Sequence, residues 1–228
     1  MKYFFIITLF FCSISLFSEQ DNSTDNNVTT TTTTTSTTNN QPRKQKDGWD
    51  LYAEGNYTAS IKALDEEKKQ FPTRINIFII LGWNYKAIKN YKEMEKISLE
   101  GFAINPTHIN ILRNLGEAYF FQGKYQDAIK QFEKYLKIRN DWNDPNTHLI
   151  YTYLGTSYFH TGYLFKADLA LSTANSGKSN NVQTLLLLAE INEKLEKNDK
   201  AISYYEKVLI IDPINNAAKT AISRIKKG

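Results

Sequence analysis

The chain has a single cysteine and only three histidines among its 228 residues. Cys12 lies in an apolar N-terminal stretch, so a mature protein without this stretch has no disulfide, thiol nucleophile or cysteine-bound metal. His148 and His160 fall in one predicted helix, about 18 Å apart at a rise of about 1.5 Å per residue. That distance is too long for two ligands of one metal ion. The sequence therefore predicts no metal site, no cofactor and no enzyme activity.

The chain also lacks a strong excess of one charge. It has 28 lysines and arginines against 24 aspartates and glutamates, which gives a formal net charge of +4 at pH 7. The two signs alternate along the predicted helices, as is typical of solvent-exposed helix faces. We expect no nucleic-acid partner.

Two short motifs resemble ligand sites but lack essential residues. The segment Ser176–Ser179 reads SGKS, yet Ser172 replaces the earlier glycine of a phosphate-binding loop, and the segment follows a helix instead of a strand. The segment Asn140–Asn146 lacks the central glycine and the closing glutamate of a calcium-binding loop. We interpret it as a solvated loop that carries one aromatic residue, Trp142.

The first 18 residues have the order of a secretory signal peptide: Lys2, then the apolar stretch Tyr3–Phe17, then small or polar residues. A membrane-spanning helix needs about 20 apolar residues, so we predict cleavage after Ser18. The expected location is the periplasm or cell envelope of a bacterium, or outside the cell if the host is eukaryotic. Two alternatives stay open, a retained anchor or lipidation at Cys12, and only these would give the chain a membrane contact.

Residues 19–42 are almost entirely asparagine, threonine, serine and aspartate. Such a stretch cannot bury enough apolar surface to offset its loss of conformational entropy. The sequence therefore predicts a disordered linker between the signal peptide and the folded part.

From residue 43 onward, apolar residues at three- and four-residue spacing predict helices. The helices recur with a fixed period, because Gly48, Gly82 and Gly116 are 34 residues apart. Gly155 follows Gly116 after 39 residues, so an insertion of five residues separates these two units. Tyrosines and prolines keep the same period, namely Tyr57, Tyr91 and Tyr125, and Pro72 and Pro106.

The third unit shows the pattern most completely, with Leu112, Leu115, Gly116, Tyr119, Ala128 and Phe132. This pattern resembles the tetratricopeptide repeat, a helix–turn–helix unit of about 34 residues. In the second unit, Met94 and Ser98 stand where the family has a small residue and an aromatic one. The first unit has Lys44 and Asp47 at usually apolar places, so its opening helix is expected to be short.

The resemblance implies an all-α fold, an α-solenoid with a right-handed superhelix of about five helix–turn–helix units and a C-terminal capping helix. The predicted repeat domain covers residues 43–228. Its expected units are residues 43–74, 75–108, 109–146, 148–181 and 182–214, and the capping helix is 215–227. We expect the small residues Gly116 and Ala128 to let paired helices approach, while Tyr119 and Phe132 fill the space beside them.

In this family the first helix of each unit lines the concave face. Counting from the Leu-Gly pair, the inward-facing places are aromatic in the first four units and polar or charged in the fifth, with Gln183, Glu190, Glu193 and Lys194. Trp49 and Trp83 occupy equivalent places, so they should lie side by side. Exposed aromatics with polar neighbours are typical of interface hot spots. The predicted partner-binding groove consists of Trp49, Tyr52, Trp83, Lys86, Arg113, Glu117, Phe120 and Phe159, although Phe120 and Phe159 would equally suit packing between neighbouring helices.

The predicted function is that of a non-catalytic adaptor or scaffold of the cell envelope, which binds a peptide or helix of a protein partner in this groove. Envelope assembly machinery is one candidate partner. A self-associating surface protein, hence a homo-oligomer, and a carbohydrate or cell-wall binder are the alternatives, because both would use the same aromatics. The carboxylate clamp of some family members is not supported, since Trp83 takes a central place beside Asn76 and Lys86.

Overall fold

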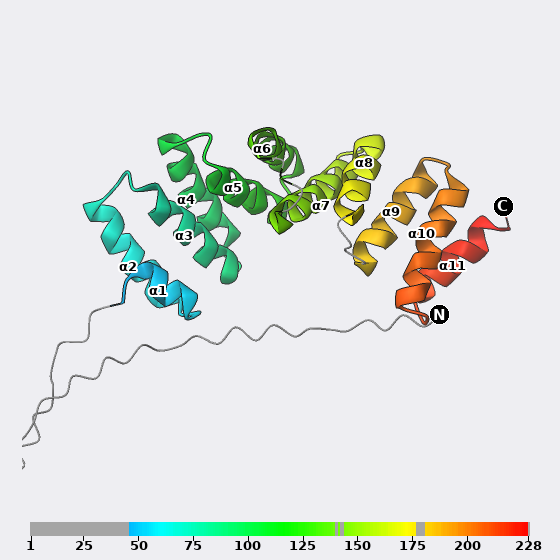
Figure 1. Cartoon of the computed structure of the whole chain (residues 1–228), viewed down its shortest axis with the longest axis horizontal. Coiled ribbons are helices and arrows are strands. Elements are labelled where there is room, and N and C mark those ends of the chain that lie inside the picture. The colour runs from blue at the N-terminus through cyan, green and yellow to red at the C-terminus, as the bar shows by residue number, and fades with distance from the viewer. Residues whose placement is uncertain (1–45, 140, 142–143, 177–180, 228) are drawn as a thin grey trace, which may run out of the picture. The chain divides into compact units, whose positions relative to one another are not determined.

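The computed structural model describes residues 46–139, 141, 144–176 and 181–227. The predicted signal peptide with Cys12, the predicted linker, Trp142 and most of the SGKS motif lie outside the described residues. The described part contains eleven α-helices and no strand (Figure 1). The helices are α1 (Gly48–Ala53), α2 (Tyr57–Gln70), α3 (Ile75–Ala87), α4 (Tyr91–Ile104), α5 (Ile109–Phe121), α6 (Tyr125–Ile138), α7 (Pro145–His160), α8 (Leu164–Ser176), α9 (Val182–Lys194), α10 (Asn198–Ile211) and α11 (Asn216–Ile225).

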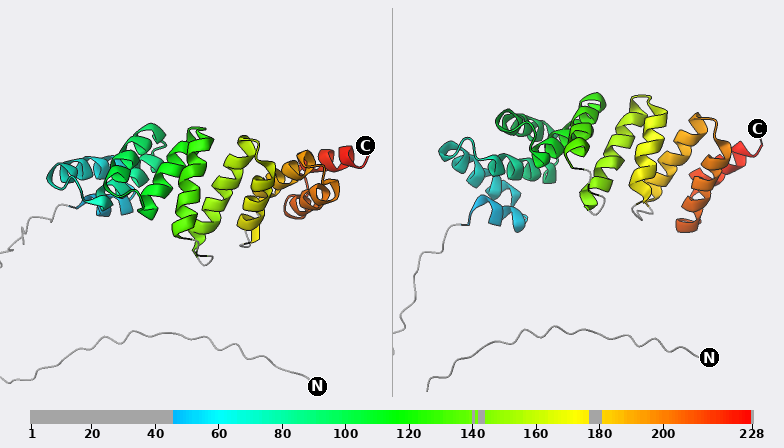
Figure 2. Two further views of the ribbon diagram at one scale, coloured as in Figure 1. Left: turned by 90° about the horizontal axis from the view of Figure 1, so that it is seen from above. Right: turned by 45° about the horizontal axis from the view of Figure 1, so that its top comes forward.

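The helices form five hairpins, α1–α2 to α9–α10, which are stacked in sequence order and followed by α11 (Figures 1 and 2). The predicted all-α solenoid with a terminal helix is confirmed. The first helices of successive hairpins also contact one another, α1 with α3, α3 with α5, α5 with α7 and α7 with α9. No comparable contact joins the second helices among the described residues. The first helices are therefore the more closely spaced set and form the inner face.

The recurring glycines make room for one large side chain of the partner helix. A Cβ atom added at Gly116 would lie 2.6 Å from the ring of Phe132, which has no exposed surface. Gly48 and Gly155 have the same relation to Leu64 and Leu171. We expected Gly116 and Ala128 to let the paired helices approach. In the structure the space at Gly116 is filled by the Phe132 ring of the partner helix. A large residue therefore follows each of these three glycines after 16 positions.

The second hairpin solves the same problem differently. Ser98 stands where the other hairpins have a large side chain, and it leaves the space over Gly82 unfilled. Asn114 of the next hairpin enters that space, so that a Cβ atom at Gly82 would lie 2.3 Å from its Nδ2 atom. The same Nδ2 atom donates a hydrogen bond to the carbonyl oxygen of Ile79 at 3.1 Å. This departure from the repeat pattern therefore ties α5 to α3.

Each hairpin turn contains one residue in the left-handed backbone region. Gly55, Gly123 and Gly162 have φ angles of 79°, 74° and 81°. At the equivalent places of the second and fifth hairpins, Lys89 and Glu196 have φ angles of 57° and 59°. Side chains with a Cβ atom disfavour this region by about 1–2 kcal/mol, so the hairpin geometry imposes the conformation even where glycine is missing.

Polar contacts on the second helices join successive hairpins. In each case an acid on the second helix of one hairpin accepts hydrogen bonds from the next hairpin. Glu95 accepts from Gln122 at 2.7 Å and from Lys124 at 2.6 Å, and Glu133 accepts from the hydroxyl of Tyr158. These contacts fix the rotation of one hairpin against the next.

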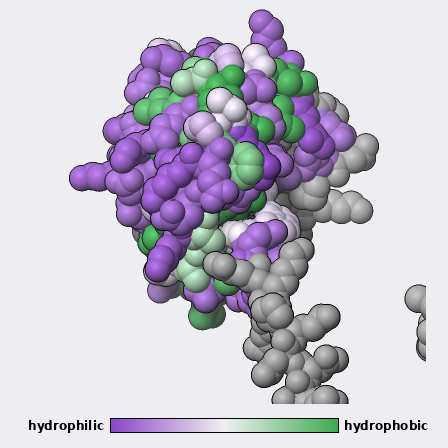
Figure 3. All heavy atoms as spheres, turned by 90° about the vertical axis from the view of Figure 1, so that its left-hand side faces the viewer, coloured by the Kyte–Doolittle hydropathy of each residue, from purple (hydrophilic) through white to green (hydrophobic). Residues whose placement is uncertain are grey.

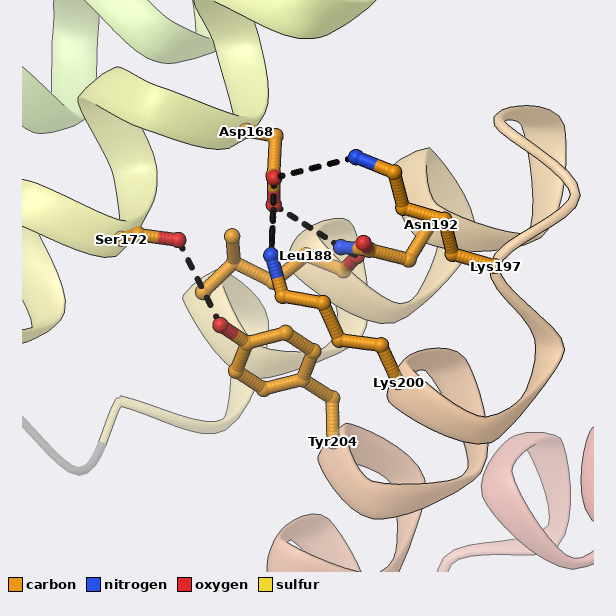
Figure 4. A network of polar contacts seen from close by, with 7 residues as sticks. All are labelled: Asp168, Ser172, Leu188, Asn192, Lys197, Lys200 and Tyr204. Atoms are coloured by element: carbon orange, nitrogen blue, oxygen red, sulfur yellow. Dashed lines mark hydrogen bonds and ion pairs between the residues drawn. The ribbon is translucent and has the colours of Figure 1, made fainter.

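The most extensive of these networks surrounds Asp168 on α8 (Figure 4). Its Oδ1 atom accepts a hydrogen bond from the fully buried Asn192 at 2.9 Å, and Lys200 Nζ lies 2.8 Å from Oδ2. Lys197 Nζ lies 4.0 Å from Oδ2 and brings a second positive charge to the carboxylate. Burial by itself would raise the pKa of Asp168, but the hydrogen bonds from Lys200 and Asn192 and the nearby positive charges outweigh it, so the pKa lies below its usual value.

The lowered pKa of Asp168 predicts an acid-dependent loss of stability. A group with a depressed folded pKa stabilises fully above its unfolded pKa, which is about 3.9 for aspartate, and loses this contribution as the pH falls through its folded pKa. We expect the free energy of unfolding, measured by urea denaturation from neutral pH downward, to decrease below about pH 5. The Asp168→Asn variant should show a shallower decrease. An identical pH dependence in both chains would contradict this assignment.

The last helix covers the open side of the fifth hairpin. Ala218 and Ala221 of α11 are buried, and Ile222 and Ile225 pack against the same core, whereas Lys219 and Lys226 are exposed. The predicted capping role of this helix is confirmed. No described helix is both long and apolar enough to cross a membrane. Seen from the side of Figure 1 where α1 and α2 lie, the surface is mostly hydrophilic with separate hydrophobic areas (Figure 3).

Candidate partner-binding surface

Four rings form an aromatic cluster at the N-terminal end of the inner face: Trp49 and Tyr52 of α1, Tyr57 of α2 and Trp83 of α3. The ring centroids of Trp49 and Trp83 are 6.0 Å apart, and both lie 5.8 Å from that of Tyr52. Trp49 keeps 49% of its surface exposed, while the other three rings are half-buried. The cluster is therefore a packed platform with one open ring.

A chain of buried hydrogen bonds holds the short helix α1, and with it the aromatic cluster, in place. The Ser60 hydroxyl donates to the carbonyl oxygen of Gly48 at 2.6 Å, and Asn84 Nδ2 donates to the Ser60 hydroxyl at 2.9 Å. Asp47 caps the N-terminus of α1, because its side chain accepts a hydrogen bond from the amide of Asp50 at 2.9 Å. These contacts join α1, α2 and α3, so that a helix of six residues can present two aromatic side chains.

Three charged residues of the predicted groove lie on α3 and α5 close to Trp83. Lys86 Nζ lies 2.7 Å from Glu117 Oε2, and the Arg113 guanidinium lies 5.9 Å from the centre of the Trp83 ring. Arg113 also donates to Asn146 Oδ1 at 2.7 Å. The charged group thus links α3, α5 and α7 beside the aromatic cluster.

Glu117 is not available as a surface contact. It is only 1% exposed, because its carboxylate points between the helices toward Lys86, and its Oε1 atom has no hydrogen-bond partner among the described residues. The structure thus places the Glu117 carboxylate behind Lys86 and not on the surface of the predicted groove. Its role is to hold the half-buried Lys86 at the rim of the aromatic cluster.

The buried charge also affects a neighbouring tyrosine. Burial, and to a smaller extent the negative charge of Glu117, raise the pKa of Tyr153 to about 12, although the positive charge of Arg113 opposes the shift. The Tyr153 hydroxyl is consequently neutral at physiological pH. It cannot serve as a base or a nucleophile in this state.

Phe120 and Phe159 lie away from the aromatic cluster and are half-buried. The Phe120 ring is 4.7 Å from Tyr153 and 5.4 Å from Phe121, and Phe159 has Lys194 Nζ 6.0 Å above its ring. Both pack against the hydrophobic core, which is the alternative that the sequence analysis left open for them. Most of their surface is used in packing between helices, and only a part of each ring is open to a partner.

A wide concavity lies at the other end of the inner face, lined by α7, α9 and α11. This C-terminal groove has a volume of about 1200 Å³. Its lining residues include Thr152, Thr156, Gln183, Leu186, Leu187, Glu190, Lys194, Asn216, Ala217, Thr220 and Arg224. The repeat phase placed several of them on the inner face, but it gave no sign of the depth of the groove, which depends on how α11 is placed against α9.

The described residues offer no evident chemistry on either surface. No group of three or more histidine, cysteine, aspartate or glutamate side chains among them is placed to hold a metal ion. Glu193 in the C-terminal groove is paired with Arg224 and accepts a hydrogen bond from Tyr205. Both surfaces present side chains suited to binding.

Comparisons with known proteins agree with the fold. A protein-family model described as "Anaphase-promoting complex, cyclosome, subunit 3" matches residues 122–208. Two Hsp70-Hsp90 organising proteins of Plasmodium falciparum are 25% identical over 123 residues, or 54% of this chain. The matched segment spans 47% of one relative and 21% of the other, the latter from isolate 3D7.

Solved structures show the same architecture. A crystal structure of MamA superimposes with a TM-score of 0.65 at 20% identity and covers 75% of this chain and 96% of its own. The MamA 41-end structure from Desulfovibrio magneticus RS-1 has a TM-score of 0.64 at 15% identity, with coverages of 74% and 93%. The APC/C hetero-tetramer Cut9-Hcn1 gives 0.62 at 19% identity, covering 78% of this chain and 35% of that one. At these identities the likeness establishes the fold.

Proposed function

We propose that the chain is a non-catalytic adaptor of the tetratricopeptide-repeat type, which binds a peptide or helix of a protein partner at the aromatic cluster. The observation that carries this proposal is the contact between Trp49, Tyr52 and Trp83, in which Trp49 stays half exposed. Tryptophan, tyrosine and arginine are the residue types that most often dominate interface energies. Because these rings are already packed against one another, they lose little side-chain entropy when a partner side chain is buried on them.

The charged neighbours support a peptide partner over a sugar. Only Trp49 among the three rings is open enough for a face-on contact, so a sugar would find a single stacking surface. Arg113 lies 5.9 Å from the centre of the Trp83 ring, and Lys86 is on the same helix as Trp83; both can donate hydrogen bonds to a carbonyl or carboxylate of a bound peptide. The partner segment is therefore expected to combine an apolar anchor with hydrogen-bond acceptors.

We also propose that the adaptor works in the cell envelope. This part rests on the predicted signal peptide of residues 1–18 and on the predicted linker of residues 19–42, which would hold the repeat domain away from an anchor if the signal is retained or lipidated. Assembly machinery of the envelope is the proposed class of partner. Cell fractionation with an antibody against the repeat domain tests the location separately from the binding surface.

The Trp49→Ala/Trp83→Ala double variant is expected to weaken partner binding by at least about tenfold. Affinity capture from the native host with the wild-type chain identifies partners, and titration of one purified partner then gives the dissociation constants. The control is Phe165→Ala, because this ring is 72% exposed on α8, away from the inner face. Equal affinities for the wild-type chain and the double variant would show that the aromatic cluster is not the binding site.

A further inference from the structure

The end of the fifth hairpin carries an unusual apolar surface. Ile210 and Ile214 are 80% and 79% exposed, the highest values for any large hydrophobic side chain in the described part of the chain, and Ile211 between them is 43% exposed. We call these three residues the C-terminal corner. Placing several isoleucines together in water is unfavourable unless another surface covers them.

The other four hairpins show that the fold does not require isoleucine at two of these places, those of Ile210 and Ile214. The place of Ile211 also holds isoleucine in the second and third hairpins, as Ile104 and Ile138. At the place of Ile210 they have Lys69, Ala103, Lys137 and Ser176. At the place of Ile214 they have Thr73, Thr107, Asp141 and Asn180. The repeat architecture therefore accepts small or polar residues at both places, and the apolar character of the last hairpin has a cause outside the fold of one chain.

The C-terminal groove begins two residues after this corner, where Asn216 and Ala217 of α11 contribute to its lining. Its lining includes the apolar side chains of Leu186, Leu187 and Ala217. Its rim carries both charge signs, since the side chains of Glu190, Lys194 and Arg224 are 50%, 49% and 66% exposed. An occupant should therefore offer apolar side chains to the three apolar residues and polar or charged groups to the rim.

We propose that the C-terminal groove binds the C-terminal corner of a second copy of this chain. The corner has the required chemistry, because three isoleucines surround a single charge, that of Asp212. This negative charge can meet Lys194 and Arg224 on the rim of the groove, where each of these cations already pairs with one acid of its own chain, Glu190 and Glu193. The corner and the groove lie at the same end of the array. Each of two copies can therefore insert its corner into the groove of the other.

A reciprocal contact of this kind is isologous and closes as a two-fold dimer, whereas a corner that met a groove at the opposite end would give an open filament. The contact is formed twice in one dimer, which brings a small surface toward the roughly 800 Å² per partner of a standard interface. The aromatic cluster lies on α1 and α3 and is not used. The dimer is thus independent of the proposed adaptor site, and either proposal can fail alone.

The test compares the full wild-type chain with the Ile210→Lys/Ile214→Thr double variant by sedimentation equilibrium over a wide range of concentrations. These substitutions copy residues that the other hairpins already carry, so the variant should fold and unfold like the wild type. We expect a wild-type dimer whose dissociation constant rises in the variant on the order of tenfold to a hundredfold. Phe165→Lys/Leu169→Thr is the matched control, because these α8 side chains are 72% and 70% exposed, and it should leave the dimer unchanged.

A second variant examines the groove itself. Thr220 is exposed on α11 and lines the groove, so Thr220→Trp should obstruct the groove and weaken the dimer to a similar extent. A wild-type chain that remains monomeric at every concentration would overturn the proposal and leave the corner to a different partner. A dimer that survives the Ile210→Lys/Ile214→Thr change, or that is weakened equally by the control pair, would overturn it as well.

Discussion

The Gly116→Leu variant is expected to lose about 3 kcal/mol of its free energy of unfolding. Leucine is a far better helix former than glycine, by roughly 1 kcal/mol, so intrinsic propensity alone predicts the opposite sign. Packing decides the outcome, because even a Cβ atom at this place would lie 2.6 Å from the ring of the fully buried Phe132. Leucine and the ring cannot share the space, so one of them must leave the core. Urea denaturation at neutral pH measures the loss.

A compensating change distinguishes this explanation from a general defect. In the Gly116→Leu/Phe132→Ala double variant the new side chain occupies the space that the ring has left. The double variant should be more stable than the sum of the two single losses predicts, by about 2 kcal/mol. Lys130→Leu on the exposed side of α6 introduces the same side chain without a clash and should change stability by less than about 0.5 kcal/mol. Additive effects of the two core substitutions would contradict the proposed complementarity.

The Asp168→Ala variant is expected to lose about 2–3 kcal/mol of its free energy of unfolding. The carboxylate is the shared acceptor for Asn192, which is fully buried, and for Lys200 (Figure 4). Hydrogen bonds to a charged group contribute more than neutral ones. The partly exposed lysines add less, because solvent screens them. The loss should concentrate at the contact between the fourth and fifth hairpins, where hydrogen exchange of α9 and α10 would report earlier opening.

An exposed ion pair provides the matched control for this variant. Asp127 and Lys130 on α6 are 3.0 Å apart, close to the 2.8 Å between Asp168 and Lys200, but their side chains are 48% and 65% exposed. The Asp127→Ala variant should therefore lose less than about 1 kcal/mol. Similar losses in both variants would show that the position of Asp168 between two hairpins has no special importance.

The fold could be predicted from the sequence because its determinants recur in phase. Gly48, Gly116 and Gly155 each meet a large side chain at a fixed distance along the chain, so one unit explains the others. The second hairpin was the exception, since Ser98 breaks the pattern and its compensation by Asn114 comes from the next unit. A contact between units leaves no periodic signal, and it could be found only in the structure.

The candidate site was only partly predictable. Equal repeat phase placed Trp49 beside Trp83, and the two rings are indeed in contact, while their role in binding remains a prediction. Repeat phase does not say which way a long side chain turns, so the burial of Glu117 against Lys86 was missed. The C-terminal groove was missed for a similar reason, because its depth depends on the placement of α11.

The turn residues bear on how such a chain can evolve. Lys89 and Glu196 adopt the same backbone conformation as the glycines of the other hairpins, so the paired helices dictate the path of the connection whatever residue occupies it. Mutations that reach these tips meet a modest and bounded penalty, whereas a new side chain at Gly116 meets the interior of its own hairpin. Sequence drift is therefore expected to gather at the tips and to spare the glycines within the helices, which lets new surface features arise while the framework of the repeats stays the same.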